Sequence, residues 1–123
     1  MERRSTPAEI VWMGNSRQVL RDWPEEIRAS VGQSLRLLQQ GFPAALAVRP
    51  MQSIGKGVFE LKEADESAWY RVIYLARIED RIYILDCFTK NTRKTARNDL
   101  ETARVRLARV QQQLREERKD AKR

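Results

Sequence analysis

Apolar and aromatic residues are concentrated in three neighbouring stretches of the chain between Val58 and Thr89, and polar turns separate these stretches. These stretches read V-F-E-L-K, W-Y-R-V-I-Y-L-A-R and I-Y-I-L-D-C-F-T, and the polar turns E-A-D-E-S-A and I-E-D-R separate them. Val, Ile, Tyr and Phe favour strands, and short polar turns join consecutive strands into hairpins. The pattern therefore predicts three consecutive antiparallel strands.

Apolar residues at helical spacing precede these strands. A helix that begins near Pro24 and ends at Gly41 is predicted from four apolar residues spaced by four, four and three positions: Ile27, Val31, Leu35 and Leu38. Ser16 is expected to cap a shorter helix that runs through Trp23. Residues 10–12 (I-V-W) are expected to form an edge strand, and the two helices an antiparallel pair against the sheet.

The segment 42–57 contains Pro43, Pro50, Gly55 and Gly57 and is predicted to be a loop with little regular structure. Met51 and Ile54 are expected to pack at the edge of the core. A final helix, capped by Asn98 or Thr95, is predicted from a seam of apolar residues: Leu100, Ala103, Leu107, Val110 and Leu114. The seam can pack into the core or form a dimer contact, and the core is favoured.

These elements predict one α+β domain over residues 1–123, with charged ends 1–7 and 115–123 that fray. A helical hairpin is expected to pack on a twisted antiparallel sheet of three to four strands, followed by a C-terminal helix. Because side chains alternate along a strand, Tyr70, Val72 and Tyr74 face one side. Ile73 and Leu75 face the other side, which needs cover from the C-terminal helix or from a partner.

Composition narrows the chemistry available to this domain. The formal net charge is +7, so an anionic partner is expected, with nucleic acid the leading candidate. The chain has no histidine, which excludes histidine-dependent nucleases and hydrolases. The single cysteine, Cys87, is interpreted as a packed, inert thiol, and neither a metal site nor a cofactor is expected. No apolar run approaches about 18 residues, so a cytoplasmic protein without membrane contact is expected.

Basic residues lie within and just after the predicted strands. Lys62 and Arg71 can share a face on neighbouring strands, where their like charges repel unless an anion lies between them. This repulsion suggests a phosphate site. The alternative is that both are ordinary sheet residues, paired with Glu60 or Asp86. Further exposed basic candidates flank the strands: Arg49, Lys56, Lys90, Arg93 and Lys94.

The order of these motifs resembles the RelE/HigB superfamily of toxins from type II toxin–antitoxin systems, and most closely its phage-related HigB-like branch. One matching strand is Tyr70-Arg71-Val72-Ile73-Tyr74. The next strand matches at its end, through Phe88-Thr89-Lys90-Asn91-Thr92. The resemblance covers roughly residues 8–114 and depends on the order and spacing of the motifs rather than on any one of them.

This resemblance implies a RelE-like fold and a ribosome-dependent mRNA endonuclease that needs no metal and activates the ribose 2′-hydroxyl for attack on the adjacent phosphate. Its implied catalytic residues are Arg71 on the scissile phosphate, Lys62 in proton transfer or charge stabilisation, and Lys90. Its implied RNA-binding residues are Arg49, Lys56, Arg93 and Lys94. Some relatives place a His or Tyr near the C-terminus as the acid; this chain has neither after Tyr83, so the leaving-group proton is expected from lysine, water or the ribosome.

The implied partners are mRNA on the ribosome and a cognate antitoxin of helix-turn-helix type, which can form a hetero-oligomer with the toxin. Two other functions fit the same resemblance. One is a ParE-type toxin that inhibits DNA gyrase, and the other is a non-catalytic relative that binds only an antitoxin. The expected discriminating variant is Arg71→Ala, which should relieve toxicity under the nuclease hypothesis while leaving the fold intact.

Overall fold

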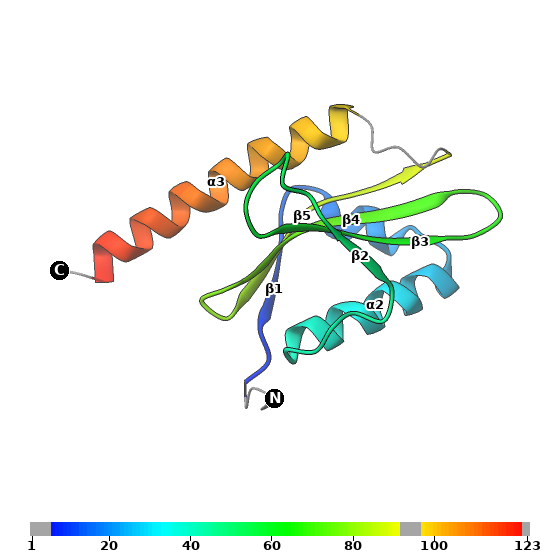
Figure 1. The fold of residues 1–123 in the computed structure, drawn as a ribbon, viewed down its shortest axis with the longest axis horizontal. Coiled ribbons are helices and arrows are strands. Elements are labelled where there is room, and N and C mark those ends of the chain that lie inside the picture. The colour runs from blue at the N-terminus through cyan, green and yellow to red at the C-terminus, as the bar shows by residue number, and fades with distance from the viewer. Residues whose placement is uncertain (1–5, 92–96, 122–123) are drawn as a thin grey trace.

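A five-stranded sheet with helices on both faces forms the centre of the molecule (Figure 1). The fold is taken from a computed structural model, which describes residues 6–91 and 97–121. The elements in chain order are β1 (Glu9–Trp12), α1 (Ser16–Arg21), α2 (Glu25–Gln39), β2 (Ala47–Pro50), β3 (Val58–Ala64), β4 (Trp69–Ile78), β5 (Arg81–Lys90) and α3 (Arg97–Ala121). The α+β class is confirmed.

The three predicted strands β3, β4 and β5 pair consecutively and antiparallel, as expected. The sheet is larger than the predicted three to four strands, with the order β1-β5-β4-β3-β2. It is also mixed rather than wholly antiparallel, because the edge strand β1 runs parallel to β5.

The strand β2 corrects the prediction of an irregular loop over residues 42–57. It pairs antiparallel with β3 along the outer edge of the sheet, and all four of its residues are exposed. An edge strand with no buried residue lacks the alternating pattern that marks a strand in sequence. Pro50 is compatible with this position because a proline removes a hydrogen-bond donor that an edge strand can spare.

The helices α1 and α2 cover one face of the sheet, with α1 against β5 and α2 against β3. The predicted stripe of α2 packs there, and Gly41, just beyond its end, has the left-handed φ of 86° that favours glycine. Ser16 is the fully buried first residue of α1 rather than its cap, a position that Asn15 holds. Cys87 is buried in this same core, as expected, and burial raises the pKa of its thiol.

The helix α3 crosses the opposite face of the sheet (Figure 1). It covers Ile73 and Leu75, so the cover that this face needs comes from the C-terminal helix. Met51 and Ile54 are buried in the same core, which confirms their predicted packing. The predicted seam packs there too, and its burial supports a core role. No helix within residues 6–91 and 97–121 is long and apolar enough to cross a membrane.

The helix α3 continues to Ala121, well past the end of its apolar seam at Leu114. Two ion pairs attach this charged extension to the β4–β5 hairpin: Arg81 to Glu117 at 3.0 Å and Arg118 to Glu79 at 3.5 Å. Residues 115–121 are therefore helical where fraying was expected. Asn98 lies inside the first turn of α3 rather than before it; Thr95, residues 1–5 and residues 122–123 lie outside the described part of the chain.

A β-bulge in β5 changes which side chains face α3. Ile73 pairs with Asp86, whereas the next residue of β4, Tyr74, pairs with Ile84, so Leu85 is the extra residue. A bulge of one residue reverses the alternation beyond it. Asp86 therefore faces α3, whereas strict alternation counted from Ile82 would direct it to the opposite face of the sheet. The residues of β5 after Asp86 are shifted in the same way.

Truncation of Leu107 in α3 tests whether this helix belongs to the core. Leu107 is buried against the sheet, so Leu107→Ala should lower the free energy of unfolding by about 2–5 kcal/mol. The matched control is Val105→Ala on the same helix, where the side chain is 52% exposed and a change within about 0.5 kcal/mol is expected. Urea unfolding measures both values. Equal small effects would mean that α3 is not part of the core.

Candidate functional site

Basic side chains gather on the α3 face of the sheet, at the end where β3 and β5 finish and β4 begins. Lys62 pairs with Arg71 across β3 and β4, and Trp69 pairs with Lys90 across β4 and β5. Residues that pair directly across antiparallel strands share a face. We call Arg49, Lys62, Trp69, Arg71 and Lys90 the basic cluster.

A buried carboxylate lies inside this cluster. The Glu60 side chain is fully buried, and its Oε1 accepts hydrogen bonds from Arg71 Nη1 at 2.7 Å and from Arg49 Nε at 3.0 Å. The negative charge expected beside Arg71 is therefore supplied by the protein itself. Pairing with Glu60 was the alternative interpretation of Arg71, and the geometry confirms that pairing.

Arg71 and Arg49 differ in their access to solvent. The Arg71 side chain is only 1% exposed, whereas that of Arg49 is 50% exposed. A phosphate can therefore reach Arg49 directly, but it can reach the Arg71 guanidinium only after neighbouring groups move. The phosphate contact predicted for Arg71 stays a prediction, and it requires such a rearrangement.

Trp69 is the member of the cluster that the sequence analysis did not single out. The Lys62 Nζ lies 5.6 Å from the centre of its indole ring, and the Arg71 Cζ lies 5.8 Å from it. Cations at this distance are attracted by the negative face of an aromatic ring. The signal in the sequence was that Trp69 precedes Arg71 by two positions, which places both on one face of a strand.

Lys90 connects the cluster to α3. Its Nζ lies 3.4 Å from Asp99 Oδ2, and its side chain remains 31% exposed. Asp86, which the bulge turns toward α3, lies 3.3 Å from Arg106 Nη1. Burial, and after it the neighbouring charge of Asp99, raises the pKa of Asp86 to about 7, and Arg106 opposes this shift.

Of the remaining predicted RNA-binding residues, the structure describes Lys56, which lies away from the cluster. Lys56 is exposed but lies before β3, at the opposite end of that strand from Lys62. Arg93 and Lys94 lie outside the described residues. Among the residues that the structure describes, no group of three or more His, Cys, Asp or Glu could hold a metal ion.

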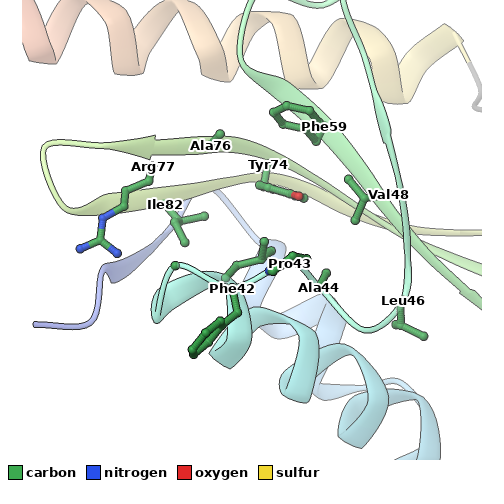
Figure 2. Close-up of a pocket in the computed structure, with 12 residues that line it drawn as sticks. Phe42, Pro43, Ala44, Leu46, Val48, Phe59, Tyr74, Ala76, Arg77 and Ile82 are labelled. Atoms are coloured by element: carbon green, nitrogen blue, oxygen red, sulfur yellow. The ribbon is translucent and has the colours of Figure 1, made fainter. Parts of the chain in front are cut away.

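A second concave surface lies on the other face of the sheet (Figure 2). It is a mainly apolar groove of about 510 Å³ between the sheet and the segment that follows α2. Phe59 and Tyr74 stack in it with ring centres 5.8 Å apart, and burial raises the pKa of Tyr74 to about 12. Its cation, Arg77, is bound by Asp80 at 2.8 Å. The groove therefore lacks the exposed positive charge of the basic cluster.

The chain belongs to the family described as phage-derived protein Gp49-like (DUF891), whose model matches residues 18–108. This membership confirms the phage-related part of the predicted resemblance. No relative among curated proteins matches the chain. One similar solved structure is the toxin–antitoxin complex RelBE2 from Mycobacterium tuberculosis. That match has 19% sequence identity and a TM-score of 0.47, and it covers 74% of this chain and 100% of the other.

Removal of one partner from the Glu60–Arg71 pair should destabilise the fold. Arg71→Ala leaves a fully buried carboxylate without its buried partner, so we expect a loss of about 3–5 kcal/mol in the free energy of unfolding. This replaces the expectation that Arg71→Ala leaves the fold intact. The double variant Glu60→Gln/Arg71→Met removes both buried charges and should recover most of the loss in urea unfolding. Full stability of Arg71→Ala would show that the pair does not hold β3 and β4 together.

Asp86 should make stability depend on pH. Its pKa of about 7 in the folded chain exceeds the ordinary value of 3.8, so the folded state retains a proton that the unfolded state loses. This contribution is fully present below about pH 4 and falls as pH rises to 7, by at most about 1.4 kcal/mol per pH unit.

Asp86→Asn removes this titration while keeping a neutral side chain of similar shape. Between pH 5 and pH 7 its free energy of unfolding should fall less than that of wild type, as measured by urea unfolding at each pH. Asp22→Asn, an exposed site with the same change in net charge, is the control. Parallel curves for wild type and Asp86→Asn would contradict the raised pKa.

Proposed function

We propose that this protein is the toxin of a type II toxin–antitoxin system, of the HigB-like branch, and that it cleaves mRNA on the ribosome. The observation that carries the proposal is the basic cluster. In it Lys62, Trp69 and Lys90 lie on one face of the sheet, at the end where β4 begins. Membership in the Gp49-like family and the order of the strand motifs support it.

The proposed reaction needs positive charge rather than a histidine. The ribose 2′-oxygen gives its proton to water, with Lys62 aiding the transfer, and attacks the adjacent phosphorus. The bond to the 5′-oxygen breaks, and that oxygen takes up a proton in turn. Products are a 2′,3′-cyclic phosphate and a 5′-hydroxyl. Negative charge builds on the phosphate in the transition state, where preorganised cations stabilise it.

The residues of the cluster have different proposed roles. Lys62 and Lys90 are the groups that touch phosphate, since both ammonium groups belong to partly exposed side chains. Protonation of the leaving oxygen comes from a lysine, from water or from the ribosome. Arg49 contributes RNA binding from the edge of the sheet. Arg71 contacts the scissile phosphate only if its pair with Glu60 opens, and otherwise it positions the strand that carries Trp69.

The proposed partner is a cognate antitoxin of helix-turn-helix type, which blocks the toxin in a hetero-oligomer. The net charge of +7 favours an acidic binding segment in that partner. The sheet face with Ile73 and Leu75 was one expected docking surface, but α3 covers it. An antitoxin therefore uses a different surface.

The test is primer extension on a defined mRNA in a reconstituted translation reaction. Wild type should produce ribosome-dependent cuts, and Lys62→Ala should slow cleavage about 100- to 1,000-fold, as expected when one charge-stabilising donor is lost. The matched control is Lys119→Ala, which removes an exposed lysine near the C-terminal end of α3 and should cleave like wild type.

Two outcomes would overturn the proposal. Intact mRNA in the wild-type reaction, together with loss of DNA supercoiling by gyrase, would indicate a ParE-type toxin. Intact mRNA with active translation and unaffected gyrase would indicate a relative that only binds an antitoxin.

A further inference from the structure

Trp69 occupies an unusual place for a tryptophan in this fold. It is half-buried as the first residue of β4, on the α3 face. Trp12 and Trp23, in contrast, pack in the core beneath α1 and α2, where Trp23 also donates a hydrogen bond to Thr89 at 3.0 Å. Within the described residues, Trp69 lies outside both apolar cores, so its indole contributes little to either of them.

The surroundings of this ring are cationic. Lys62 lies diagonally across on β3 and Lys90 lies directly opposite on β5, so a lysine stands on each side of the indole. Neighbouring strands are about 5 Å apart and Lys62 is offset by two residues along β3, which places the two lysine backbones about 12 Å apart with the tryptophan between them. Each lysine side chain is partly exposed.

A half-buried aromatic ring between two partly exposed lysines, of which Lys90 also pairs with Asp99 at 3.4 Å, matches the chemistry of an unpaired nucleotide. Single-stranded nucleic acids bind where bases stack on aromatic rings and phosphates meet lysine or arginine. We propose that Trp69 stacks against one unpaired base of the RNA substrate, while Lys62 and Lys90 hold the phosphates on either side of that base. This inference rests on the proposed function and names the group that binds the base.

An acidic protein segment is the competing occupant of such a surface. It would use the two lysines, but a carboxylate side chain gains nothing from the face of an aromatic ring, which is itself negative. The indole at the centre of the cluster therefore favours RNA over an acidic peptide. This assignment also explains why a large apolar side chain stays partly exposed in the middle of charged neighbours.

The experiment measures binding of a fluorescein-labelled single-stranded RNA nonamer by anisotropy. Trp69→Ala should weaken binding about 5- to 150-fold, the loss expected for one stacked base, and Trp69→Phe should retain most of the affinity. The matched control is Phe42→Ala, which removes an exposed aromatic ring from the groove on the other face and should bind like wild type. Circular dichroism and thermal unfolding report whether each variant is folded.

A second arm identifies the stacked base. A single abasic nucleotide is moved along the same RNA, and at one position it should weaken binding to wild type by the factor that Trp69→Ala costs. At that position Trp69→Ala should lose nothing further, because the stacking partner is already absent. Independent, multiplying losses would overturn the inference.

Failure of this inference is distinguishable from failure of the nuclease proposal. If wild type cuts mRNA on ribosomes and Trp69→Ala binds RNA equally well, the stacking inference is wrong and the nuclease proposal stands. If the stacking pattern appears without mRNA cleavage, the inference stands and the nuclease proposal is wrong. Two results would overturn the stacking inference. One is that wild type does not bind RNA. The other is that Trp69→Ala binds RNA like wild type but no longer binds an acidic antitoxin segment.

Discussion

The buried ion pair between Glu60 and Arg71 is the constraint on which the arrangement of the sheet depends. Both side chains are almost completely removed from solvent, and a buried charge without its partner is costly. A shift of β3 against β4 by one residue would place one of these charges on the opposite face. The pair therefore fixes the register, and the register places Lys62 opposite Arg71 and within reach of Trp69.

The α3 face of the sheet serves two purposes along its length. Its central part is apolar and buried beneath α3, and the end where β4 begins carries the basic cluster. Arg106 links these two regions, because it donates hydrogen bonds to the Leu85 carbonyl at 2.8 Å and to Asp86 at 3.3 Å. Lys90 and Asp99 form a second link nearby. Packing of one helix thus supports both the core and the position of the exposed cations.

Elements whose apolar residues are concentrated in one stretch, or recur at helical spacing, could be predicted from the sequence. The strands β3 to β5 and the packing of Met51 and Ile54 follow from local patterns. Three features depend on tertiary contacts and were missed or left open. The strand β2 exists because the edge of β3 accepts a partner. Arg71 is buried where it pairs with Glu60, and Lys90 shares a face with Trp69 only because of the bulge in β5.

That bulge has a consequence for how relatives of this protein should be compared. Strict alternation from Ile82 would direct Lys90 toward α2, and the extra residue at Leu85 redirects it toward Trp69. The number of residues in β5, and not only their identity, thus determines whether the lysine belongs to the cluster. A homologue that retains this lysine but lacks the extra residue would carry the same motif with its charge on the wrong side of the sheet.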